Sequence, residues 1–466
     1  MGIVTLRLGS EGFVTTIDGE RQAFDPRLFV PIQIGSRIAA EQYGTPVRGA
    51  ANGGTIDFTL GSGRLGADPD IWPWLAHHWK GRTFRVYLGD PGDAYEDLEL
   101  AYTGRVDNLT HDTLRASIGT TDARSDLDVP IVDDLYADSA PEALRGRPKP
   151  ELRGQRNCIA PVLIDEAALI YQVSRLPLDD ITELRVGGIP WDRVASSPGP
   201  AQWAPNLAAG TFQLGGSTEG GEVRVDAKAT GWASLTTAEL VRQIVTEAGG
   251  TVNAAAMAGL DAAAPYLIGW DTTTEPVNRL NALDEIMAGI VGFWTPRTDG
   301  SITAGVLAAP SSGATLALSR VGIQRLQLAG LVPPAWRIRI EHSRNAQPGT
   351  QFFDAVSEAD QQKWRSGGII APAFEDETIK TAEPRAVDVP LIRSLVNTEA
   401  DAVAIRDRAS VAWGVERRLY DVSAYVPAPE LYVTASVDFQ MVAGNFRVHS
   451  TLRSLGGGAT ALQLWG

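Results

Sequence analysis

Apolar and polar side chains alternate along several short segments of residues 1–142, with the period of two that is typical of β-strands. The clearest of these segments are Thr55–Leu60, Thr83–Leu88, Leu98–Tyr102 and Leu114–Ile118. Between the first two, residues Ile71–Ala76 follow Pro69 and are predicted to form a short helix, because proline is favoured in a first helical turn. Residues 1–142 are therefore predicted to form one β-rich domain.

A charged crossing that contains several prolines, Asp138–Pro150, separates this domain from the next one. Beyond it, short apolar runs are broken by prolines and by glycine pairs, which favour tight turns. Leu184–Val186 and Glu222–Val225 are the clearest strands in this part of the chain. Residues 143–231 are predicted to form a second, small β-rich domain.

Helical periodicity replaces the alternation in residues 232–312. Thr236 is followed three residues later by Glu239, which is the pattern of a capping box. The helix that they begin carries an apolar stripe formed by Leu240, Val241, Ile244, Val245 and Ala248. A second helix begins near Pro276, with one face formed by Val277, Leu280, Leu283, Met287 and Ile290. Phe293–Thr295 and Ser301–Val306 then flank an Asp299-Gly300 turn, so a helical insert ending in a hairpin is predicted.

Strand patterns return in residues 313–466, which are predicted to form a C-terminal β-rich domain. Trp336–Ile340 alternates, and Phe352–Trp364 is a candidate for a polar helix. A further helix is predicted to begin at Thr398 and to bury Ala402, Ile405, Ala409 and Ala412. Three alternating strands follow, with inward positions at Tyr420, Val422, Ala424 and Val426, at Leu431, Val433, Ala435 and Val437, and at Phe446 and Val448. After the Gly456–Gly458 turn a last strand reaches Trp465, so the C-terminus is expected to be held in a sheet.

The composition is that of a packed globular protein. With 466 residues the chain is roughly three times as long as a usual domain, and hydrophobic residues make up 44% and charged residues 21% of it, which excludes disorder. The fold class expected is mainly β with α+β parts. No apolar run approaches the ~20 residues of a membrane span, and Met1–Gly19 shows no signal-peptide pattern, so folding in a cytoplasm is expected.

Charge and cysteine content exclude two further classes. The 56 acidic residues exceed the 41 basic ones and give a net charge of −15, which opposes nonspecific attraction to nucleic acid. A single cysteine, Cys158, excludes an internal disulfide framework. The five histidines do not recur at the spacing of metal ligands.

The segment Gly61–Gly66 has the GxGxxG pattern of a dinucleotide site, with Asp90 placed like a ribose-binding acid. Two observations argue against such a site. Asp68 and Asp70 would lie in the helical turn that should face pyrophosphate and would repel it, and the prolines around them limit the helix. The preceding strand alternates, whereas a central parallel strand is apolar throughout. No cofactor-binding residue is therefore predicted.

The remaining candidates for chemistry are interpreted as structural. The acidic loop Gly89–Asp97 resembles a calcium loop but lacks its alternating ligands, so a hairpin turn is predicted. His77 and His78 adjoin on a helix and point about 100° apart, which does not suit one metal ion. Cys158 is interpreted as a small buried thiol, and Glu239, Asp284 and Glu285 are placed on helix exteriors or caps. The sequence thus predicts no catalytic residue and no metal site.

Four stretches together resemble the hub or tail-tip proteins of tailed bacteriophages and gene transfer agents. They are Val86–Gly92 with Glu99–Val106; Leu144–Pro150 with Asn157, Pro161–Asp165 and Tyr171–Val173; Ala263–Trp270; and Trp336–Ile338 with Phe446–Val448 and Trp465–Gly466. The second is the most specific. Asn157–Ile159 and Asp438–Gln440 depart from the family pattern, which puts loop geometry in doubt.

The resemblance implies a non-enzymatic structural protein of the virion. Such a baseplate or tail-tip hub is a homotrimer in which two β-barrel-like, tail-tube-type domains per chain form a ring of six. The ring closes the tail tube, adapts sixfold to threefold symmetry and forms part of the DNA ejection channel. The implied partners are distal tail or tube proteins above and tip or fibre proteins below, with assembly in the bacterial host cytoplasm. DNA would pass without specific binding, which the acidic balance suits.

Two other classes of function stay open at the level of sequence. One is an enzyme, such as a tail-associated cell-wall hydrolase. The other is a receptor- or carbohydrate-binding tail protein, which the twelve tryptophans favour through sugar stacking. Trp294, Trp336 and Trp413, however, lie in periodic apolar segments, so they are predicted to lie in a core or an interface.

Overall fold

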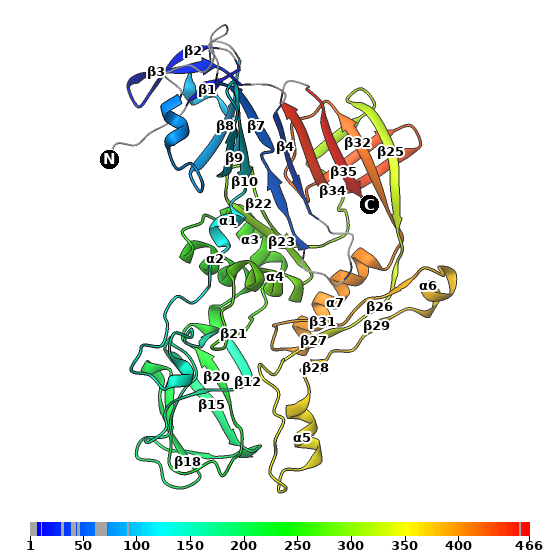
Figure 1. Cartoon of the computed structure of the whole chain (residues 1–466). Coiled ribbons are helices and arrows are strands. Elements are labelled where there is room, and N and C mark those ends of the chain that lie inside the picture. Colours follow the sequence, from blue (N-terminus) through cyan, green and yellow to red (C-terminus); the bar gives the residue numbers. More distant parts are fainter. Residues whose placement is uncertain are drawn as a thin grey trace.

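The computed structural model describes residues 7–10, 12–28, 32–38, 43, 47–60, 72–90, 93–455 and 458–466. Within them the chain is mainly β and multidomain, and it contains several separate sheets, so the predicted fold class is confirmed (Figure 1). In Figure 1, the N-terminal and C-terminal parts of the chain lie in the upper half of the view, and most of the residues between them lie in the lower half. None of the helices in the described part of the chain is long and apolar enough to cross a membrane.

A four-stranded antiparallel sheet forms the left part of the upper half. Its strands in spatial order are β7 (Thr55–Thr59), β10 (Arg115–Thr121), β9 (Glu99–His111) and β8 (Thr83–Leu88). The alternation predicted from the sequence is observed in β7, where Ile56 and Phe58 are buried and their neighbours Thr55 and Asp57 are exposed. A smaller sheet beside it contains β1 (Leu8–Gly9), β3 (Glu20–Pro26) and β2 (Phe13–Ile17).

An eight-stranded sheet forms the right part of the upper half (Figure 1). Its main path is β24 (Leu316–Ser319), β33 (Thr434–Phe439), β34 (Val442–Leu455), β35 (Thr460–Trp465), β32 (Arg417–Ala424) and β25 (Ile323–Val332). The turn between β24 and β25 brings the two ends of this path together, because Leu318 and Ile323 share one core. The sheet therefore curls, but β24 and β25 do not pair with each other, so it is not closed. The last strand pairs on both sides, so the C-terminus is held in the sheet as predicted.

The first and last parts of the sequence meet in this sheet. β4 (Ile32–Arg37) pairs antiparallel with the second half of β34, and β6 (Ala50–Asn52) pairs with β4. The inner side chains Ile32 and Ile34 pack with Ile56 and Tyr102 of the N-terminal sheet. The two upper sheets are thereby joined through β4.

A sandwich of two sheets lies at the lower end of the view and corresponds to the predicted small β-rich domain. One sheet contains β12 (Gln155–Ile159), β20 (Val223–Ala229), β15 (Leu178–Val186) and β16 (Ile189–Pro190). The other contains β13 (Val162–Asp165), β14 (Ile170–Gln172), β19 (Thr211–Leu214), β18 (Gln202–Asn206) and β17 (Asp192–Arg193). They enclose one core that includes Ile181, Val225, Trp203 and Phe212.

Helices fill the space between the sandwich and the upper sheets. They are α2 (Thr237–Glu247), α3 (Ala254–Ala263), α4 (Arg279–Gly289) and α7 (Glu399–Trp413), with the shorter α1 (Arg124–Leu127). The N-cap of the predicted capping box is confirmed, because the Thr236 hydroxyl accepts a hydrogen bond from the Glu239 amide. The reciprocal half is wrong, because the Thr236 amide donates to the Ser234 carbonyl oxygen and the Glu239 carboxylate binds Arg242 instead. The predicted hairpin of β22 (Gly292–Pro296) and β23 (Ile302–Val306) is confirmed too, and β5 (Val47–Arg48) pairs with β22.

Small sheets and single turns complete the described chain. The small sheets contain β11 (Glu151–Arg153) with β21 (Trp270–Thr272), β29 (Phe374–Glu375) with β26 (Ala335–Ile338) and β30 (Val387–Asp388), and β28 (Ile369–Ile370) with β27 (Ile340–His342) and β31 (Ile392–Arg393). The further helices are α6 (Glu377–Ala382) and the 3-10 turns η1 (Trp72–Ala76), η2 (Tyr95–Asp97), η3 (Glu142–Leu144), η4 (Leu207–Ala209) and η5 (Trp232–Ser234).

Two predicted helices differ from the structure. The segment Ile71–Ala76 forms the 3-10 turn η1, which begins at Trp72, and Pro69 lies outside the described residues. The polar helix predicted over Phe352–Trp364 is α5 (Glu358–Arg365), and Ser357 caps it by accepting a hydrogen bond from the Asp360 amide. Phe353 cannot join the helix because its ring packs on the core of the sandwich.

The division into four domains stays a prediction. The hydrophobic cores nevertheless connect parts of the chain that were predicted to be separate. The largest core contains Leu240 and Leu283 of the predicted helical insert together with Ile338 and Ile405 of the C-terminal part. The helices that follow the sandwich are therefore packed against α7 and the strands next to it.

Candidate functional site

The segments that resemble cofactor or metal sites hold no assembled site where the structure describes them. Gly61–Gly66 lies outside the described residues. In the acidic loop, which joins the paired strands β8 and β9, the Asp93 carboxylate accepts a hydrogen bond of 2.7 Å from the Asp90 amide. This is a turn contact, as the hairpin interpretation predicts. Among the described residues no group of three or more His, Cys, Asp or Glu is placed to hold a metal ion.

His77 and His78 belong to no metal-binding group of the described residues. They follow η1 instead of lying on a helix, so their predicted placement on one is wrong, and both are exposed. The ring of His77 approaches Trp79 edge-on at 6.3 Å, and Trp79 stacks on Trp74 at 6.0 Å. Trp74 and Trp79 therefore pack locally on each other.

Cys158 is buried, as predicted. Its thiol contacts the Gln347 carbonyl oxygen at 3.3 Å, and burial raises the pKa of the thiol, so the reactive thiolate is disfavoured. A small pocket beside it is lined by Arg185, Glu222 and Trp364 among others. The guanidinium of Arg185 stacks 3.6 Å from the centre of the Trp364 ring and binds Asp226 through two hydrogen bonds, so it is fully engaged in packing.

Two of the helix carboxylates have structural partners that the sequence did not indicate. Asp284 was placed on a helix exterior, but its side chain is only 17% exposed, and it accepts hydrogen bonds from Arg48 at 3.0 Å and from the indole of Trp294 at 2.8 Å. It ties α4 to β5 and β22. Glu285 accepts a hydrogen bond from Trp270 at 3.3 Å. Neither carboxylate faces the other as an acid/base pair.

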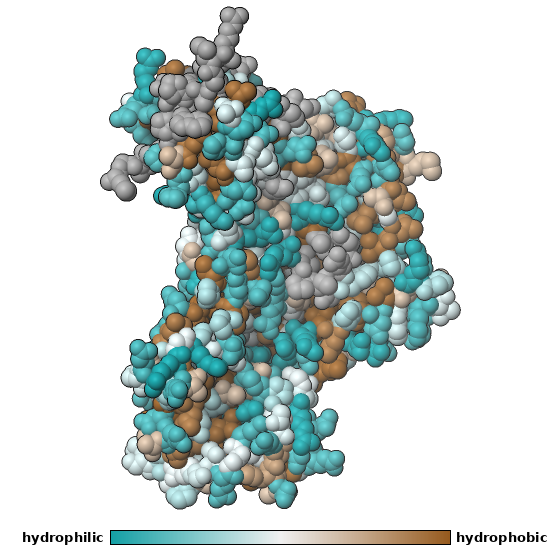
Figure 2. Space-filling view, in the orientation of Figure 1, coloured by the Kyte–Doolittle hydropathy of each residue, from teal (hydrophilic) through white to brown (hydrophobic). Residues whose placement is uncertain are grey.

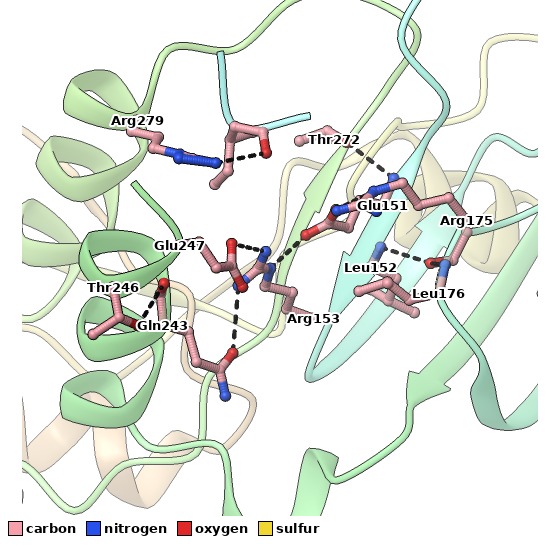
Figure 3. A network of polar contacts seen from close by, with 12 residues as sticks. Glu151, Leu152, Arg153, Arg175, Leu176, Gln243, Thr246, Glu247, Thr272 and Arg279 are labelled. Atoms are coloured by element: carbon pink, nitrogen blue, oxygen red, sulfur yellow. Dashed lines mark hydrogen bonds and ion pairs between the residues drawn. The ribbon is translucent and has the colours of Figure 1, made fainter. Parts of the chain in front are cut away.

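A buried polar network joins the sandwich to the helices (Figure 3). Glu151, which has no exposed surface, binds Arg153 and also Arg175, at 2.6 Å. The other side of the Arg153 guanidinium binds Glu247 of α2 at 2.7 Å, and the Glu151 amide donates to the Thr272 hydroxyl at 2.9 Å. Burial lowers the pKa of Arg153, but the hydrogen bonds to Glu247 and the charge of Glu151 outweigh it, so that pKa is raised and the charged form is held. The network holds β11, next to the sandwich, against α2, and none of its side chains is a free nucleophile.

The feature that remains is the edge strand β25. Within the described residues it pairs only with β32, and its other edge faces no strand. Its ten residues present about 33 Å of unpaired backbone. Both faces of its middle part are exposed, with Leu328 and Leu331 at 49% and 41% exposure. Figure 2 shows apolar side chains on the right flank of the molecule, where β25 runs in Figure 1.

β25 lacks most of the devices that protect edge strands in monomeric proteins. It contains no proline and no lysine, and Arg325 is its only charged residue. Two register shifts interrupt its pairing with β32. Between them, Arg325–Leu328 pairs with β32 without interruption. A long edge with few charges is a ready surface for pairing with a strand of another chain, although the two register shifts give it some protection. We therefore take β25 as the candidate functional site.

The sequence reasoning missed this strand. The segment Ile323–Val332 lies between Gly322 and Pro333-Pro334, which could have been recognised as the boundaries of a strand. Nothing in the sequence, however, shows which strand lies at the edge of a sheet, because strand order depends on contacts between distant segments.

No protein-family model matches the sequence, and no curated protein matches it. Among solved structures, the fold is similar to a 43 kDa tail protein of prophage MuSo2 from Shewanella oneidensis, at 12% identity over 97% of this chain and 98% of that one, with a TM-score of 0.36. It is also similar to a tail protein from Neisseria meningitidis MC58, at 11% identity over 97% and 94% of the chains, with a TM-score of 0.40.

A third similar structure is a chain of the virion of a native gene transfer agent particle. Identity is 13% over 72% of this chain and 87% of that one, and the TM-score is 0.39. These scores are too low to establish a common family or a common function.

Proposed function

We propose that this chain is a structural subunit of a phage-type tail, which assembles side by side with further copies. The observation that carries the proposal is the long edge of β25, which no strand of the described residues pairs with. A soluble monomer with such an edge is at risk of aggregation, whereas a subunit of an assembly uses it as an interface. The resemblance of four sequence stretches to tail hub proteins supports the distal end of a tail as the location of that assembly.

The finer form of the proposal is a homotrimeric hub. Each chain contributes two sheets to its upper half, the four-stranded sheet and the eight-stranded sheet, and these lie beside one another (Figure 1). Three chains would place six sheets in one ring, which adapts a sixfold tube to a threefold tip. Distal tail proteins and tip proteins would bind above and below this ring at the tail tip.

The same ring would enclose part of the DNA ejection channel. The net charge of −15 supports this role, because an acidic wall does not retain passing phosphates. Mapping of the residues that face the lumen of the assembled particle tests this part of the proposal. A net basic lumen would contradict it.

The mass of the purified protein in solution tests the proposal as a whole. We expect a trimer, or a monomer that trimerises when a neighbouring tail protein is added. A micrograph of the parent particle with this chain labelled should place the label at the tail tip. A protein that stays monomeric under all conditions and turns over murein or a nucleotide would be an enzyme, and the proposal would be wrong.

A further inference from the structure

The described part of the upper half carries a second free edge, in the other upper sheet. β8 is the outer strand of the four-stranded sheet, and within the described residues it pairs only with β9. In Figure 1, β8 is drawn to the left of the other strands of its sheet, with η1 and the β1–β3 sheet further to the left, and β25 lies on the right flank. Among the described residues, one chain therefore presents two unpaired strand edges at opposite ends of its two upper sheets.

The other edge strand of the four-stranded sheet is β7, and its outer edge is not free. β7 is covered by a bridge between Leu28 and Phe58, and the Thr59 amide donates to the Arg27 carbonyl oxygen at 3.0 Å. At the far end of the eight-stranded path, β24 has four residues and turns directly into β25. β8, with six residues, is the longer unpaired partner for a second chain.

We propose that β25 of one copy pairs through its main chain with β8 of the next copy, so that copies join head to tail. This inference rests on the proposed function and names the contact that builds the ring. Two different edges at opposite ends of the two upper sheets make a heterologous contact, which closes into a ring when the rotation per subunit divides the circle. An isologous contact of β25 with β25 would stop at a dimer and would leave both copies of β8 unpaired.

The charges on the two edges suit contact between copies of one acidic protein. With a net charge of −15, copies repel one another wherever acidic residues face each other. Neither edge contains an aspartate or a glutamate: β25 reads IQRLQLAGLV and β8 reads TFRVYL. Each contains one arginine, Arg325 or Arg85. Pairing of the two edges therefore brings no two carboxylates of the strands together.

Placing a charge on the edge tests the role of β25. The double variant Leu328→Lys/Ala329→Lys puts two lysines on exposed positions, so the fold should be kept. It should weaken self-association about tenfold or more, because the charges would have to be desolvated on pairing. The matched control is Ile369→Lys/Ile370→Lys, which replaces two exposed side chains of β28 in the lower half of the view and should leave association unchanged (Figure 1). Equal association of both variants and the wild type would overturn the inference.

Cross-linking identifies the strand that β25 meets. Two differently tagged copies are prepared, one with Gln327→Cys and one with Arg85→Cys, which replace exposed side chains near the centre of each strand. Cys158 is buried and should not react. After mixing, a short bis-maleimide should join the cysteine at position 327 of one tagged copy to the cysteine at position 85 of the other. Exchange of the two cysteines between the tags should give the same product.

The possible results separate this inference from the proposed function. A 327–327 product would show an isologous contact and would overturn the head-to-tail pairing. A trimer by mass that gives no 327–85 product would also overturn the pairing but would leave the structural role of the chain intact. A protein that is monomeric in every condition would contradict both.

Discussion

At the scale of single residues, the most unusual environment is that of His449. Its imidazole is buried and lies between the rings of Tyr432 and Trp465, with ring centres 5.8 and 5.4 Å away. Burial, together with the nearby positive charges of Arg37 and Arg447, lowers the pKa of His449 to about 3. The side chain is therefore neutral in the folded protein over the whole physiological range.

This depressed pKa predicts that acid weakens the fold. Between about pH 6.5 and pH 3, the unfolded chain binds a proton at His449 that the folded chain does not bind. The contribution of His449 to the free energy of unfolding should therefore be constant above pH 6.5 and should fall below it, by up to about 1.4 kcal/mol per pH unit. His449→Phe keeps the ring stack and should reduce the slope, as measured by denaturation at several pH values. Equal slopes for the variant and the wild type would contradict the prediction.

At the scale of elements, a side-chain cap precedes each of the helices α2 to α7. α7 begins after Thr398, whose hydroxyl accepts a hydrogen bond of 3.1 Å from the Asp401 amide. The inward positions predicted from the sequence, Ala402, Ile405 and Ala409, are all buried against the shared core. Cap and periodicity agree, which is why this helix was predicted correctly over its whole length.

The cap of α7 can be tested separately from its packing. Thr398→Ala removes the acceptor and should destabilise the first turn by about 1 kcal/mol. Hydrogen exchange of the amides in that turn should become about fivefold faster, since opening of the helix end is easier. Thr398→Ser keeps the hydroxyl and is expected to exchange like the wild type. If Ser and Ala behave alike, the hydroxyl is not the stabilising group.

At the scale of the whole molecule, buried charges and shared cores hold together units that are distant in sequence. The network in Figure 3 joins β11 at the edge of the sandwich to α2 and to β21. The loop that precedes α5 adds a second connection, because Thr350 donates to Glu222 and the Phe353 amide donates to the Gly187 carbonyl oxygen at 2.9 Å. Gly187 has a φ of +56°, and a Cβ there would lie 2.5 Å from the Phe353 ring, so glycine is required.

Removal of Glu151 should weaken the connection between the sandwich and the helices. Glu151→Ala leaves the buried Arg153 and the partly buried Arg175 without their shared carboxylate, which should lower the free energy of unfolding by about 3–5 kcal/mol. Arg242→Ala removes an ion pair with Glu239 on the exposed face of α2 and serves as control, with an expected change within about 0.5 kcal/mol. Chemical denaturation measures both. Similar losses in the two variants would show that burial of the network does not matter.

Local signals in the sequence were enough to predict the class of fold, several strands with one buried face, the caps of two helices and the buried thiol. Each of these depends on neighbouring residues, such as the alternation in β7 or the Thr236–Glu239 cap. Only the tertiary structure decided that β4 joins the C-terminal sheet, that Asp284 binds Trp294, and that β25 and β8 are edge strands among the described residues. Strand order and partner choice follow from contacts between residues hundreds of positions apart, and the periodicity of a segment carries no information about which distant segment it will meet.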